Sequence, residues 1–162
     1  YTYGYPSTVF VTNIPTLSIT TVGGIHVLNP TGKYGSPDVI LPSTISNPVT
    51  VEVSAINIPV GTQVTVTAVP EYGSSTSTSG TLSGTDASST ASASITLSTT
   101  YQSILTATAT FTVQTAMYWD DEKIEKVRVA ATMGKESEVV YITEKGREIK
   151  SGELMARFMG GR

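Results

Sequence analysis

Apolar and polar residues alternate along much of the chain between residues 16 and 116. Valine or alanine fills every second position over residues 49–55 and 64–68, and the same period of two runs through residues 89–97 and 104–113. Because successive side chains of a strand point to opposite faces, this pattern predicts strands with one buried face. Shorter strands are predicted at residues 17–21, 25–28, 39–41 and 76–83.

These strands are short and are separated by turn signals rich in glycine, proline and asparagine. Roughly seven of them, with a turn every 8–12 residues or so, are typical of two antiparallel sheets packed as a sandwich. Composition favours the same fold, since 46 of the 162 residues are serine or threonine and another 29 are valine or isoleucine. Thr, Val and Ile are β-branched residues that fit a pleated surface better than a helix. We therefore predict an all-β sandwich.

Several short segments carry a resemblance to a known class of module: SPDVILP at 36–42, NPVTV at 47–51, NIPVGT at 57–62, GTLSG at 80–84 and TATF at 108–111. Together they resemble the Thr/Ser-rich immunoglobulin-like or fibronectin-III-like modules of bacterial secreted and surface proteins. The resemblance covers roughly residues 16–116. It implies an immunoglobulin-like sandwich fold for that part of the chain.

Charge divides the chain near residue 116. Residues 1–116 carry one basic and four acidic side chains, whereas residues 117–162 carry nine of each sign. The first part is kept in water by hydroxyl groups and the second by interspersed charges. We therefore divide the chain into an extended N-terminal segment (1–15), the sandwich (16–116) and a C-terminal part (117–162).

The C-terminal part is predicted to form a three-stranded meander and a short helix. Its strands are expected at residues 127–133, 137–143 and 148–149, and Gly146 is free to take the positive φ of the second turn. Ser151 is a suitable N-cap for a helix that places Leu154, Met155 and Phe158 on one face. So short a segment rarely folds alone. It should pack on the sandwich or on a neighbouring subunit.

No residue constellation for catalysis, cofactor binding or metal binding is found. His26, the single histidine, has no nucleophile and orienting carboxylate near it in sequence, so a structural role is expected. Asp120, Asp121 and Glu122 could offer oxygen ligands to calcium, but they lack the alternating spacing of a calcium loop and run into Lys123. A solvated connector is the favoured interpretation. We predict that the protein is not an enzyme.

Composition also limits the partners. The chain has no cysteine, which excludes disulfides and thiolate metal sites, and no basic cluster, which argues against nucleic acid. It has no apolar run of the ~18 residues that a membrane span needs. A homo-oligomer is the expected assembly, and glycans are the other partner considered.

The N-terminal segment is the candidate interaction site. Tyrosines alternate at positions 1, 3 and 5, and residues 8–14 follow as an uncharged strand pattern. Tyrosine buries a large area at low entropic cost, so such stretches favour contact surfaces. The predicted interface residues are Tyr3, Tyr5, Val9, Phe10, Val11 and Ile14. Pairing with another subunit and pairing with the chain's own sandwich both remain open.

These patterns predict a structural protein outside the cell. A chain that starts with Tyr1 is expected after removal of a secretion leader or after trimming, so we expect an extracellular or cell-surface location. The predicted function is that of a non-enzymatic subunit of a bacterial extracellular fibre or surface layer, assembled into a filament by strand addition between subunits. The alternative is a carbohydrate-binding or adhesive module of a secreted surface protein.

Overall fold

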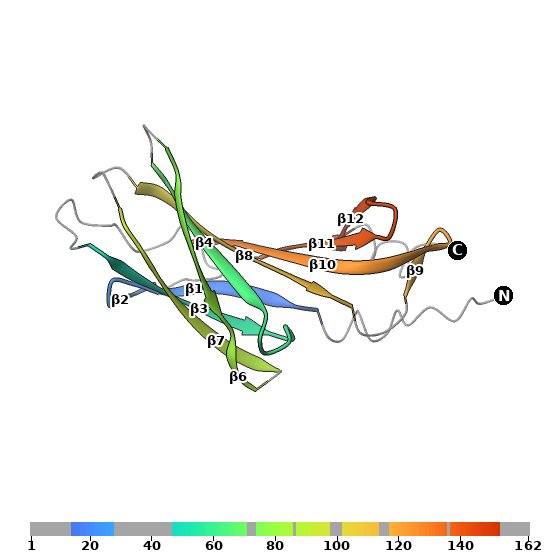
Figure 1. Ribbon diagram of the computed structural model, residues 1–162, viewed down its shortest axis with the longest axis horizontal. Coiled ribbons are helices and arrows are strands. Elements are labelled where there is room, and N and C mark those ends of the chain that lie inside the picture. The colour runs from blue at the N-terminus through green and yellow to red at the C-terminus, as the bar shows by residue number, and fades with distance from the viewer. Residues whose placement is uncertain are drawn as a thin grey trace.

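The computed structural model describes residues 14–27, 47–70, 74–85, 87–97, 102–113, 117–135 and 137–152. These residues form two antiparallel sheets that pack face to face, which confirms the predicted all-β, two-sheet architecture (Figure 1). The predicted strand at 39–41 and the N-terminal strand pattern over residues 8–13 lie outside the described residues. So does the predicted helix beyond Gly152, of which only the helical turn at Ser151 and Gly152 is described.

The smaller sheet has the strand order β2-β1-β3-β7-β6. Its strands are β1 (Thr16–Val22), β2 (Ile25–His26), β3 (Val49–Ile56), β6 (Ser83–Thr85) and β7 (Ser88–Ile95). Neighbouring strands of this sheet run antiparallel throughout. The sheet therefore begins at the β2–β1 hairpin and ends at the short strand β6.

The larger sheet has the order β12-β11-β10-β8-β4-β5, and β9 pairs with β10 beside it. Its strands are β4 (Gln63–Pro70), β5 (Thr76–Thr81), β8 (Gln102–Thr112), β9 (Tyr118–Trp119), β10 (Glu122–Thr132), β11 (Glu138–Thr143) and β12 (Glu148–Lys150). β10, β11 and β12 form the antiparallel meander that the sequence predicts, with Gly134 and Gly146 at positive φ in its two turns.

The core consists of the inward positions of both sheets. Val51 and Val53 of β3 face Val64 and Val66 of β4 across the sandwich, and all four are at most 2% exposed. The outward residues between them are Glu52 on β3 and Thr65 on β4. Burial of alternate side chains in these strands is the dominant stabilising term, at roughly 25 cal/mol for each Å² of apolar surface removed from water.

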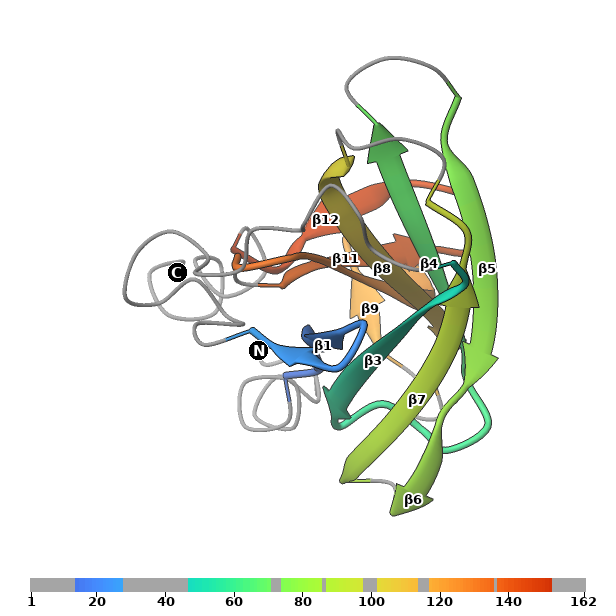
Figure 2. The same cartoon turned by 90° about the vertical axis from the view of Figure 1, so that its left-hand side faces the viewer.

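One side of the sandwich is closed by a strand that changes sheets. β5 belongs to the larger sheet and β6 to the smaller one, and the buried Leu82 joins them. The Leu82 N–H donates to the Thr62 carbonyl (3.0 Å), while the Leu82 carbonyl accepts from the Gly61 N–H (2.9 Å). Next to this crossing, Gly80 lies directly against the Ser92 carbonyl of β7. Figure 2 shows β5 and β7 side by side there.

The strongly charged part of the chain belongs to the same sheet as the hydroxyl-rich part. β10 pairs with β8 from Lys126↔Thr112 to Thr132↔Thr106, without interruption. Val127 and Val129 of β10 lie in the common core. The change in charge near residue 116 is thus a change in the chemistry of the outer face within one continuous sheet.

Candidate functional site

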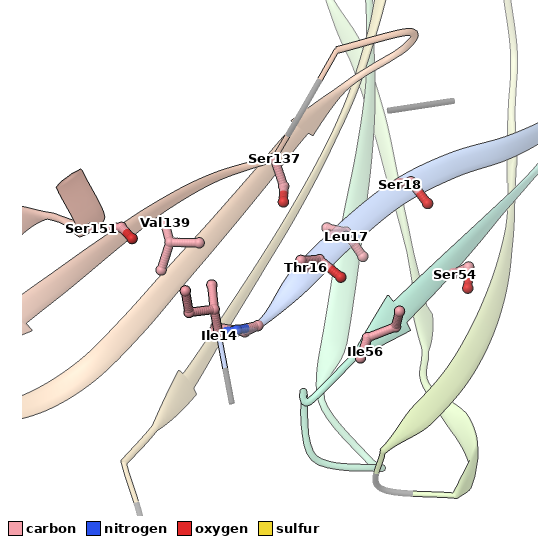
Figure 3. A pocket seen from close by; sticks show the side chains of 10 residues that line it. Ile14, Thr16, Leu17, Ser18, Ser54, Ile56, Ser137, Val139 and Ser151 are labelled. Carbon is pink, nitrogen blue, oxygen red and sulfur yellow. The ribbon is translucent and has the colours of Figure 1, made fainter. Parts of the chain in front are cut away.

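A groove of about 420 Å³ opens beside the start of β1 (Figure 3). It lies between the start of β1, the end of β3 and the start of β11. Half of its lining residues carry hydroxyl groups (Thr16, Ser18, Ser54, Ser137, Ser151) and half are apolar (Ile14, Pro15, Leu17, Ile56, Val139). No lining residue is charged, so the groove suits a neutral occupant.

The groove follows from the unequal width of the two sheets. The smaller sheet ends at β1 and β2, and β1 packs across the sandwich against β8 and β10. On this side the larger sheet continues through β11 and β12. Figure 3 shows the Ile14 side chain pointing from the start of β1 toward Val139 of β11, while Ile56 projects from β3 on the other side of β1.

The edge of β1 that faces away from β3, here called the free edge because it is partly unpaired among the described residues, runs beside the groove. β2 pairs with only Thr21 and Val22 of β1, and the Val27 N–H donates to the Thr20 carbonyl (2.9 Å). Within the described ranges, no strand pairs with residues 16–19 on this edge. Alternate N–H and C=O groups of an edge strand point away from its one partner and can pair with an added strand. The site is therefore a strand edge next to a neutral groove.

The other sheet edges are less suited to accept a strand. β6 has three residues, all exposed, and β5 is backed by the close approach of Gly80 to β7. β12 also has three residues and carries Glu148 and Lys150. Short strands and charged side chains are features that oppose edge-to-edge pairing. β5 is longer and uncharged, but its outer edge lies against β7. Among the described edge strands that are neither short, charged nor backed in this way, β1 remains, with residues 16–19 unpaired.

The charged edge at β12 is held by an ion pair. Arg128 of β10 donates to Glu148 across the outer face of β11, with 3.0 Å between Nη2 and Oε1. This hydrogen bond and the positive charge of Arg128 lower the pKa of Glu148. Glu148 is therefore a carboxylate at neutral pH, and the β12 edge carries charged side chains.

Only one of the predicted interface residues falls in the described part of the chain. Ile14 lines the groove and packs against the core, and its carbonyl accepts a hydrogen bond from Asn57 Nδ2 (3.3 Å). Tyr3, Tyr5, Val9, Phe10 and Val11 lie outside the described residues, as do the aromatic rings considered for carbohydrate binding. The sequence did not point to Ser137 or Val139, because nothing in their local pattern indicates that β11 lies beside β1.

The acidic cluster forms a tight turn that faces an arginine. Asp120 and Asp121 are the two loop residues between β9 and β10, with φ of 47° and 66°. Arg147 Nη1 lies 3.5 Å from an Asp120 oxygen and 3.4 Å from a Glu122 oxygen. The Thr143 hydroxyl also donates to Glu122 (2.7 Å). In this arrangement, Arg147 neutralises part of the acidic charge.

His26 is exposed on the short strand β2. Among the residues that the structure describes, no group of three or more His, Cys, Asp or Glu side chains is placed to hold a metal ion. The described residues also contain no helix long and apolar enough to cross a membrane. Comparisons with protein-family models, with curated proteins and with solved structures found no match.

Proposed function

We propose that the protein is a non-enzymatic structural subunit of a bacterial extracellular fibre or surface layer, and that subunits assemble by strand addition. The observation that carries this proposal is the free edge of β1 beside a neutral groove. A strand added there pairs the outward N–H and C=O groups of β1 and places its alternate side chains in the groove. Repeated head-to-tail addition generates a filament.

The N-terminal segment supplies a suitable donor. Residues 8–14 (TVFVTNI) are uncharged and strongly β-prone, and they come directly before β1 in the chain. The tyrosines at positions 1, 3 and 5 add contact area at the same end. Donor and acceptor thus belong to one chain, as a self-assembling subunit requires.

The outer faces support a location outside the cell. On the larger sheet, hydroxyl groups pair across β4 and β5, with 3.1 Å between the oxygens of Thr65 and Ser79 and 2.9 Å between those of Thr67 and Ser77. This surface is hydrated by hydroxyl groups, with few charges. In the same proposal, the sandwich is an immunoglobulin-like module, and a short helix starts at Ser151.

Deletion of residues 1–13 tests the function. We expect the full chain to form filaments in negative-stain electron microscopy and the shortened chain to remain a folded monomer with unchanged far-UV circular dichroism. A matched control replaces Tyr1, Tyr3 and Tyr5 by serine, which keeps residues 8–14 and should weaken assembly without abolishing it.

Two results would contradict the proposal. One is a full chain that stays monomeric at every concentration tested, particularly if it binds on a glycan array, which would support the carbohydrate-binding alternative. The other is assembly that persists unchanged after deletion of residues 1–13.

A further inference from the structure

We propose that the acceptor for strand addition is the edge of β1 that is unpaired among the described residues, and that its occupant is residues 8–13 of a second copy of this chain. This inference rests on the proposed function and assigns its partner and its site. It is carried by the geometry of the chain where residues 1–13 join the structure, by the length of the edge and by the chemistry of the groove.

A chain that folded back on its own β1 would need a very tight turn. Only Ile14 and Pro15 separate residues 8–13 from Thr16. Two-residue hairpin turns require positive φ at the first central residue, which a β-branched isoleucine strongly disfavours. The common I′ type also requires it at the second, where the ring of Pro15 fixes φ near −65°. A longer turn would consume donor residues.

A hydrogen bond ties Ile14 to the end of β3 in its own chain. The Ile14 carbonyl accepts from Asn57 Nδ2, and Asn57 directly follows β3. The Ile14 side chain lines the groove and packs against the core of the same chain. Residues 8–13 are therefore the part of the donor pattern that can pair with a second copy.

The donor is long enough for the available edge. Since β2 pairs with Thr21 and Val22 and the Thr20 carbonyl accepts from the Val27 N–H, the edge available for a donor is residues 16–19. At about 3.3 Å per residue, this edge extends roughly 13 Å and residues 8–13 extend roughly 20 Å. The donor residues that do not pair bridge to their own sandwich.

The groove and the donor also match in chemistry. Neither the ten lining residues nor residues 8–14 include a charged side chain. In the arrangement we propose, Val9 and Val11 lie on the face directed at Leu17 and Val139. Phe10 then lies on the outward face, beside the outward residues Thr16 and Ser18 of β1.

A charge on the acceptor edge tests this assignment. Lysine on an edge strand opposes strand addition, so Ser18→Lys should raise the concentration needed for assembly by about tenfold or more. Ser94→Lys is the matched control, since Ser94 is an exposed outward residue of β7, two strands away in the same sheet. Both variants should keep the circular dichroism and melting temperature of the unchanged chain.

Cross-linking provides a second readout that does not depend on loss of assembly. The chain has no cysteine, so introduced thiols can react only with each other. Chains with Thr8→Cys or Thr12→Cys, on the Phe10 face of the donor, are mixed with a tagged chain that carries Ser18→Cys. We expect a disulfide between tagged and untagged chains for at least one donor position, and none when the tagged chain carries Ser94→Cys.

The outcomes separate this inference from the proposed function. A full chain that never assembles overturns the proposed function. A chain that assembles, loses assembly without residues 1–13, and yet tolerates Ser18→Lys as well as Ser94→Lys overturns the acceptor assignment alone. Loss of assembly only in the Ser18→Lys variant, with cross-linking to Ser18→Cys, supports both.

Discussion

Tyr141 shows how one buried residue links the C-terminal meander to the core. It lies on β11 between Val127 of β10 and Ile149 of β12, and it is 1% exposed. Removal of its phenol from water raises the pKa of Tyr141 to about 12, because the ionised form is the one that loses hydration. The neutral form is therefore favoured by folding.

This shift predicts a loss of stability in alkali. A group whose pKa is higher in the folded state contributes its full stabilisation at pH values below its pKa in the unfolded chain. For Tyr141 that unfolded pKa is about 10, and the stabilisation is lost as the pH rises through the folded pKa of about 12. The free energy of unfolding should fall by on the order of 2 kcal/mol over this interval on account of Tyr141. Urea unfolding of the unchanged chain and of Tyr141→Phe between pH 8 and 12 measures it. Equal pH slopes for the two proteins would contradict the prediction.

At the scale of single residues, the sequence predicts which side chains are buried well, and it predicts the backbone conformation of turns less well. The alternation of valine with polar residues identifies Val51 and Val53 as inward residues, because a strand has only two faces. Asp120 and Asp121, by contrast, suggest only a solvated connector. Their positive φ values arise because β9 pairs with β10 across a two-residue loop, and a two-residue strand leaves almost no pattern in the sequence.

At the scale of elements, the sequence predicts the length of the main strands and which of their residues face inward. It does not predict which strands lie next to one another. The strand expected at 76–83 is divided at Leu82 between two sheets, because the closing side of a sandwich needs a strand that crosses. The groove could not be predicted from the sequence either, because it depends on which strands lie side by side. It joins residues near 14–18, 54–56, 137–139 and 151, and only the order of strands in space brings these segments together.

The crossing predicts a specific sensitivity at Gly80. A Cβ added there would collide with the Ser92 carbonyl of β7, and a backbone atom cannot move aside easily. Gly80→Ala should therefore separate β5 from β7 and cost about 1–3 kcal/mol of stability. Gly152→Ala is the control, because a Cβ at that position meets no atom within 4 Å.

Thermal unfolding followed by circular dichroism measures the difference between these variants. For a chain of this size, the expected cost corresponds to a decrease in melting temperature of several degrees. If Gly80→Ala melts at the same temperature as Gly152→Ala, β5 and β7 are not in close contact in solution.

At the scale of the whole molecule, one sheet carries two kinds of surface. The outer face is hydroxylic over β4, β5 and β8 and becomes charged over β10, β11 and β12. The charged strands end at the β12 edge, which short length and charge protect, whereas β1 has no charged residue. Under the proposed function, this difference favours strand addition at the β1 edge over the β12 edge.

The continuity of the larger sheet predicts that residues 117–162 do not fold alone. β10 is hydrogen-bonded to β8 along seven residue pairs, and its inward residues Val127 and Val129 are buried in the core shared with the first part of the chain. An isolated fragment loses that partner strand and exposes those side chains, and a sheet so small has little else to bury. We expect the fragment to give a disordered circular dichroism spectrum without a cooperative melt.

Mixing it with residues 1–116 should restore β-structure, because each fragment supplies the strand that the other lacks. A monomeric fragment that melts cooperatively by itself would show that β10 does not depend on β8.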